Sequence, residues 1–172
     1  MADPRTRLAD LPRRRPLASL ALAVLASEVV GAAGAVFTVG GLESWYGTLV
    51  QPALAPPNWV FGPVWTTLFA LMGAAAWLVW RELDGPNDGR RPGGALAWFA
   101  GQFVLNVAWS AAFFGARSIV AGLVVIAALW LAIVGTVRAF DRVDRRAAAL
   151  LLPYLAWVSF AGYLNYAFWT LN

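Results

Sequence analysis

Five long apolar stretches follow one another along the chain, and the short segments between them hold most of its charged residues. The stretches cover residues 17–39, 59–80, 95–116, 118–140 and 147–171. A helix needs roughly 20 apolar residues to cross the hydrocarbon core of a bilayer, and each stretch meets that length. The pattern predicts an all-α membrane protein: a five-transmembrane-helix bundle over residues 17–172, preceded by a basic cytoplasmic segment at residues 1–16.

Two other interpretations of the same pattern stay open. The arginine-rich start followed by an apolar run also resembles a cleaved signal peptide, although the run is long for one. A second alternative has four spans, with one apolar segment lying in the membrane interface.

Every basic residue of the chain is an arginine, and the arginines fall mainly on one side of the predicted spans. They precede the first span, lie between the second and third, and lie between the fourth and fifth; only Arg117 falls on the opposite side. Those on the first side are Arg5, Arg7, Arg13, Arg14, Arg15, Arg81, Arg90, Arg91, Arg138, Arg142, Arg145 and Arg146. Because cytoplasmic loops are enriched in arginine and lysine, we expect a cytoplasmic N-terminus and an external C-terminus.

The composition narrows the chemistry that the protein can perform. The chain is 60% hydrophobic and only 13% charged, whereas a soluble domain is about a quarter charged. It has no His and no Cys, so the commonest metal ligand, the usual general base and the thiol nucleophile are all missing. We therefore expect no metal site and no required cofactor. Because the arginines cluster beside apolar spans, we also expect no nucleic-acid partner. The 10 Trp and 10 Phe leave aromatic faces, amides and hydroxyls as the main resources.

Several polar or aromatic residues stand inside the predicted spans. Gln102, Asn106 and Ser110 are spaced by four residues and share one helix face. Trp157, Ala161 and Asn165 repeat this spacing in the last span, and Glu28 is the one carboxylate within a predicted span. Such residues either join helices through hydrogen bonds or line a shared cavity, because polar side chains avoid lipid. Spacing alone leaves both interpretations open, and it leaves the role of Glu28 undecided between function and packing.

The segment after the first span is apolar, rich in proline and free of arginine. It reads WY at positions 45–46 and QPALAPPNW at 51–59. Proline restricts its own backbone and that of the residue before it, so the segment should be stiff. The pattern fits a lid packed on the mouth of the bundle, and it fits equally well an aromatic belt at the membrane interface.

A set of motifs resembles the TspO/MBR family, which contains translocator proteins and tryptophan-rich sensory proteins. The matching residues are WY at 45–46, PPNWVFGPVW at 56–65, LMG at 71–73, GQ at 101–102, LN at 105–106, FFGAR at 113–117, PYLAW at 153–157 and LNY at 164–166. The resemblance covers roughly residues 28–172 in the right order. It implies a five-helix fold, usually a homodimer, with a pocket beneath the loop that joins the first two helices.

The resemblance also implies a ligand, protoporphyrin IX or a haem-like tetrapyrrole, and a role as sensor or regulator of tetrapyrrole or stress responses. The positions that match the family pocket are Tyr46, Trp65, Phe69, Asn106, Trp157 and Ala161. With the polar positions above, the predicted ligand site comprises Tyr46, Trp65, Phe69, Gln102, Asn106, Ser110, Trp157, Ala161 and Asn165. Two alternatives remain: a transporter of porphyrins or small lipophiles, and an enzyme that degrades porphyrin photo-oxidatively, for which the resemblance points to Trp65 and Trp157.

The sequence departs from the family pattern at two places. Ala53-Leu54-Ala55 stands before the double proline, where family members commonly carry a Trp. The cholesterol motif of animal members needs a basic residue shortly after a Tyr, and none follows Tyr166, so sterol binding through that motif is not expected.

Overall fold

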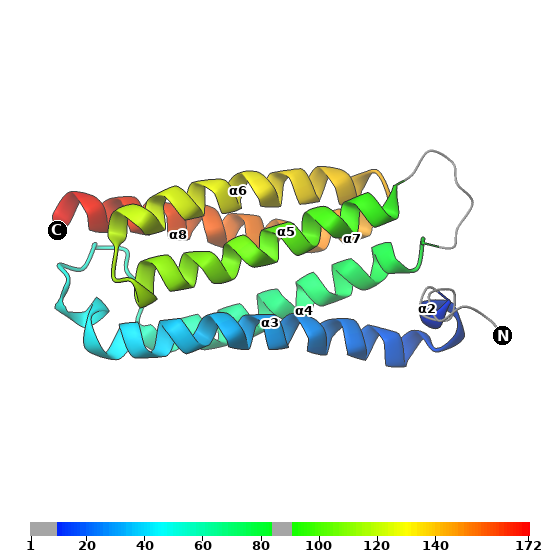
Figure 1. Ribbon diagram of the computed structural model, residues 1–172, viewed down its shortest axis with the longest axis horizontal. Coiled ribbons are helices and arrows are strands. Elements are labelled where there is room, and N and C mark those ends of the chain that lie inside the picture. Colours follow the sequence, from blue (N-terminus) through cyan, green and yellow to red (C-terminus); the bar gives the residue numbers. More distant parts are fainter. Residues whose placement is uncertain (1–9, 84–90) are drawn as a thin grey trace.

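The computed structural model describes residues 10–83 and 91–172, and within these ranges the chain is helical with no strand. The helices are α2 (Leu11–Arg14), α3 (Pro16–Ser44), α4 (Phe61–Trp80), α5 (Pro92–Ser110), α6 (Ile119–Asp141), α7 (Arg145–Leu150) and α8 (Leu152–Leu171). Short 3-10 turns, η1 (Tyr46–Thr48) and η2 (Asn58–Val60), lie between α3 and α4, and a π-helical turn, η3 (Ala111–Gly115), continues α5. Figure 1 shows the long helices running side by side.

Five helical segments of the described chain are long and apolar enough to cross a membrane, which confirms the predicted five-helix fold and not the four-span alternative. The first helix differs from its predicted range, because it continues to Ser44 instead of ending near residue 39. The pair Gly40-Gly41 does not break it. A Cβ at Gly41 would lie 2.7 Å from the Cβ of Phe114, so the glycine lets η3 approach the helix there.

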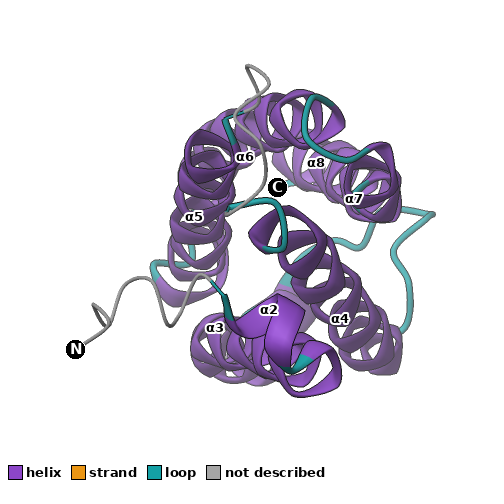
Figure 2. Cartoon of the chain, turned by 90° about the vertical axis from the view of Figure 1, so that its right-hand side faces the viewer, coloured by secondary structure: helices purple, strands orange, loops and turns teal. Residues whose placement is uncertain are grey.

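The helices form a ring around an aromatic core. Figure 2 shows this arrangement end-on: α3 lies between α4 and α5, α6 lies between α5 and α8, and α7 closes the ring against α4. The last predicted span consists of α7 and α8, which meet at Leu151 just before Pro153.

Close contact between α3 and α4 depends on glycine. A Cβ at Gly73 would lie 2.6 Å from the Cα of Val24 and 2.8 Å from the carbonyl oxygen of Ala23. Further along the same pair of helices, a Cβ at Gly31 would overlap the ring of Phe69. The two helices therefore touch through backbone in the half of the bundle nearest α2, as small residues permit in membrane proteins.

The connection between α5 and α6 is the tight turn that the sequence predicts. Arg117 adopts a positive φ of 52°, which reverses the chain immediately after η3. The hydroxyl of Ser118 then accepts a hydrogen bond from the backbone N–H of Ala121 and caps α6. The guanidinium of Arg117 donates to Oγ of Ser44 at 3.2 Å, which ties this turn to the end of α3.

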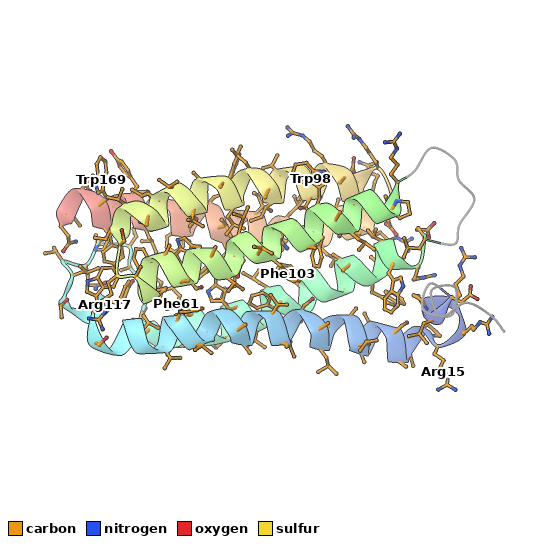
Figure 3. The ribbon with its side chains drawn as sticks, in the orientation of Figure 1. Arg15, Phe61, Trp98, Phe103, Arg117 and Trp169 are labelled. Atoms are coloured by element: carbon orange, nitrogen blue, oxygen red, sulfur yellow. The ribbon has the colours of Figure 1, made fainter. Side chains whose placement is uncertain are left out.

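Most of the described arginines lie at one end of the bundle. Those in or beside α2, the end of α4, the start of α5, the end of α6 and the start of α7 share this end, whereas Arg117 lies at the other. Figure 3 shows the separation for Arg15 and Arg117. Arg5, Arg7 and Arg90 are outside the described residues, as is most of the predicted N-terminal segment. The orientation of the bundle in the membrane stays a prediction.

Candidate functional site

A cavity of about 340 Å³ lies between α3, α4 and α5. The α3 side is formed by one stripe of the helix, at Glu28, Gly31, Ala32, Ala35, Thr38, Val39 and Leu42, with Gly34 beside it. At the 1.5 Å rise per residue of a helix, the stripe from Glu28 to Leu42 is about 21 Å long. Because most of these residues are small, they leave an elongated space instead of filling it.

The α4 side of the cavity is aromatic. Phe61, Trp65 and Phe69 line it at helical spacing, and the rings of Trp65 and Phe69 stack with centroids 5.5 Å apart. Phe69 rests against the bare backbone at Gly31 and forms the deep part of this wall. Phe61 lies towards the end of the bundle that holds Arg117, as Figure 3 shows. The cavity therefore offers flat apolar surface along most of its length.

Asn106 and Ser110 of α5 supply amide and hydroxyl groups to the cavity. Nδ2 of Asn106 donates to the hydroxyl of Tyr154 at 3.0 Å, and Tyr154 donates to Oε1 of Gln102 at 2.8 Å. Gln102 in turn points its Nε2 at the sulfur of Met72, 3.9 Å away. The network fixes the amide of Asn106 at the cavity wall.

The three polar residues predicted to share one face of α5, Gln102, Asn106 and Ser110, therefore have different roles. Ser110 lines the cavity, Asn106 lines it and also joins helices, and Gln102 is buried in the interhelical network without lining the cavity. Hydrogen bonding between helices and a shared cavity, the two interpretations left open by the sequence, both apply on one helix face.

A second, much smaller pocket of about 30 Å³ lies beside the first and is lined by three of the predicted site residues: Tyr46, Ala161 and Asn165. This is about the space of one water molecule. Phe61 lines both pockets. Asn165 accepts a hydrogen bond from Nε1 of Trp109 at 3.3 Å and donates one to the carbonyl oxygen of Ile119 at 2.9 Å, so its amide holds α5, α6 and α8 together.

Trp157 lines neither pocket. Its ring meets the ring of Phe61 edge-on, with centroids 6.2 Å apart, so it lies behind the residue that lines both pockets. The structure thus brings Trp65, Phe69, Asn106 and Ser110 to one cavity and places Trp157 one aromatic layer away from it.

The sequence-based site omits some residues that the structure places at the cavity. Phe61 and Asn58 lie within the motif at 56–65 and are spaced for the same helix face as Trp65. That spacing was a usable signal. Thr38 and Thr66 line the cavity too, but nothing distinguishes them in the sequence from other threonines on helices.

The segment between α3 and α4 is fastened to the end of the bundle at two points. The buried ring of Tyr46 packs against Phe168 with centroids 5.1 Å apart, and Gln51 donates through Nε2 to the carbonyl oxygen of Tyr46. The side chain of Asn172 accepts from the backbone N–H of Val50 at 2.8 Å and donates to its carbonyl oxygen at 3.3 Å. These contacts agree with the interpretation of this segment as a lid on the end of the bundle.

The cavity is open on the flank of the bundle, between α3 and α4. Several of its lining residues are exposed on the outer surface of the spans: Ala32, Ala35, Val39, Gly62 and Thr66. In a bilayer this flank faces lipid, so the cavity has a side opening between these two helices.

Comparison with known proteins gives a consistent result. Residues 23–170 match the model of the TspO/MBR family. The chain is 45% identical to the tryptophan-rich protein TspO of Chlorobaculum tepidum, over 92% of this chain and 98% of that protein. It is 42% identical to the translocator protein of Homo sapiens, over 81% of each. It is 38% identical to the tryptophan-rich sensory protein of Cereibacter sphaeroides, over 83% of this chain and 88% of that one.

Proposed function

Because the chain belongs to the TspO/MBR family, we propose that it binds a porphyrin or related tetrapyrrole in the cavity between α3, α4 and α5. Family membership and five apolar helices make it an integral, multi-pass membrane protein and support a role as a membrane sensor or regulator. The tetrapyrrole is the signal that this sensor would read.

The proposal rests on one observation: the cavity is elongated, has an aromatic wall, and includes the unpaired indole N–H of Trp65. Among the described residues no hydrogen-bond partner reaches Nε1 of Trp65, so this indole N–H is available to a ligand in the cavity. Apolar pockets with a few placed polar groups suit large planar ligands. Trp65, Asn106 and Ser110 supply those groups around a stacked aromatic surface.

Titration of the purified protein with protoporphyrin IX, followed by porphyrin absorbance, tests the proposal. Trp65→Phe keeps an aromatic ring but loses the donor and part of the wall. We expect its affinity to fall about 2- to 12-fold, the equivalent of about 0.5–1.5 kcal/mol for one good aromatic contact. Trp130→Phe is the matched control, because Trp130 lies outside the cavity and bonds to Ser159. No binding to the native protein, or equal losses in both variants, would refute the proposal.

Photo-oxidative breakdown of the porphyrin is the second candidate function, and the placement of Trp65 on the cavity favours it. In that case the Trp65→Phe protein would form less photoproduct per bound porphyrin under illumination. Trp157→Phe would have a smaller effect, because Phe61 separates Trp157 from the cavity. Equal photoproduct yield per bound porphyrin in all variants would leave binding without catalysis.

A further inference from the structure

Among the described residues that line the cavity, Glu28 has the single ionisable side chain. It lies on α3 one turn below Gly31 and Ala32, where Phe69 closes the deep part of the aromatic wall. Along the helix it is about 20 Å from Arg15, the nearest preceding arginine. None of the described arginines lines the cavity.

The carboxylate of Glu28 has no partner within the described part of the chain. No hydrogen bond or ion pair reaches it from residues 10–83 or 91–172. Every fully buried side-chain oxygen or nitrogen in these ranges has a partner, so the unpaired oxygens of Glu28 are not fully buried. Glu28 is half-buried and lines the cavity, so its carboxylate is accessible to a ligand there. An unpaired carboxylate at membrane depth is costly unless a counter-charge or donor reaches it.

The surroundings of Glu28 define what that counter-charge should look like. The rings of Phe69 and Trp65 follow within the next two turns towards the mouth of the cavity, and they attract both apolar bodies and cations. A ligand with a protonated amine on a short stem from a flat aromatic body would place the amine at Glu28 and the body against these rings. A ligand with a carboxylate at its deep end would meet like charge.

We infer that Glu28 makes this cavity selective for basic aromatic ligands, with the Glu28 carboxylate as the counter-ion of a protonated amine. The inference goes beyond porphyrin binding and rests on the proposed function only because both use the same cavity. If the ligand is a porphyrin, the inference predicts that the carboxylate groups of the porphyrin point away from Glu28, towards the loop end of the cavity.

Three pyrene probes that share one ring system test the inference: pyrenemethylamine, pyrenemethanol and pyrenecarboxylic acid. Each is titrated into the protein in nanodiscs of one neutral lipid composition, and binding is followed by quenching of Trp emission. We expect the native protein to bind the ammonium probe about tenfold more tightly than the alcohol, as a charge-assisted hydrogen bond would give. The carboxylate probe should bind most weakly. No preference for the ammonium over the alcohol in the native protein overturns the inference without any variant.

Glu28→Gln should abolish the preference for the ammonium and strengthen binding of the carboxylate probe, while binding of the alcohol stays unchanged. Glu28→Asp keeps the charge and should retain part of the preference. Asp141→Asn is the matched control, because it makes the same change of acid to amide at the end of α6, outside the cavity. A preference that survives in Glu28→Gln, or that disappears in Asp141→Asn, contradicts the assignment.

The same nanodiscs titrated with protoporphyrin IX separate this inference from the proposed function. Ammonium selectivity without porphyrin binding would refute the proposed function alone. Porphyrin binding without ammonium selectivity would refute the role of Glu28 alone.

Discussion

At the scale of single residues, Tyr154 shows how a polar group stabilises a bundle in which the surrounding solvent is lipid. Its hydroxyl is both acceptor for Asn106 and donor to Gln102, and it is completely buried. In hydrocarbon no water replaces a lost partner. The orientation of the Asn106 amide at the cavity therefore depends on a hydroxyl that does not itself line the cavity.

Tyr154→Phe should destabilise the protein by about 1–2 kcal/mol, because it leaves Asn106 and Gln102 each short of one hydrogen bond. Unfolding in mixed micelles measures this loss. Tyr163→Phe on the same helix serves as the control, since Tyr163 is 51% exposed and its substitution should be nearly neutral. Equal stability of Tyr154→Phe and the native protein would show that the network contributes nothing measurable.

Much of the candidate site could be predicted from residue patterns, and the reason for the exceptions is physical. Trp65, Phe69, Asn106 and Ser110 were identified by helical spacing and by the family motifs, and they do line one cavity. Spacing gives the face of a helix but not the neighbour that occupies the space in front of it. Phe61 stands in front of Trp157, and no pattern within the last span indicates that.

At the scale of elements, the pairing of α3 with α4 depends on positions without side chains. Gly73 allows backbone contact near Val24, and Gly31 allows the ring of Phe69 to pack against α3. From Glu28 towards the loop, the cavity lies between the two helices. In a chain this rich in alanine and glycine, composition cannot tell which glycine faces a neighbouring helix.

Gly73→Ala should destabilise the bundle by about 1–3 kcal/mol, because the new methyl group would meet the backbone of α3 at 2.6–2.8 Å, where no rotamer change can relieve it. Gly101→Ala is the matched control on α5. No atom lies within 4 Å of a Cβ there, and replacing a helical glycine by alanine is neutral or stabilising by up to about 1 kcal/mol. Thermal unfolding in detergent compares the two variants, and the reverse ranking would contradict this account of the helix crossing.

At the scale of the whole molecule, the number of spans and the grouping of the arginines follow from sequence because both depend on the bilayer. Element boundaries follow less well. The first helix extends past Gly40-Gly41 because Phe114 packs against it there, and the last span is divided at Leu151. Both features depend on neighbours that are distant in the sequence.

The orientation in the membrane can be tested with single cysteines, since the native chain has none. Ala53→Cys in the α3–α4 segment should react with an impermeant thiol reagent in intact cells, whereas Leu83→Cys at the end of α4 should react only after lysis. Both positions are exposed on the protein, so accessibility alone would not separate them. The opposite labelling pattern would reverse the predicted topology and leave the fold unchanged.

The side opening between α3 and α4 has a consequence for how affinity should be expressed. A lipophile that reaches this flank is dissolved in the bilayer, so its occupancy is most directly expressed through its mole fraction among the lipids. Diluting the protein into more lipid at fixed total protoporphyrin should therefore empty the site, and the apparent aqueous dissociation constant should rise in proportion to lipid volume. The constant expressed per lipid should stay the same. If added lipid left the aqueous constant unchanged, protoporphyrin would not be partitioning into the bilayer, and supply of the site from lipid would be excluded.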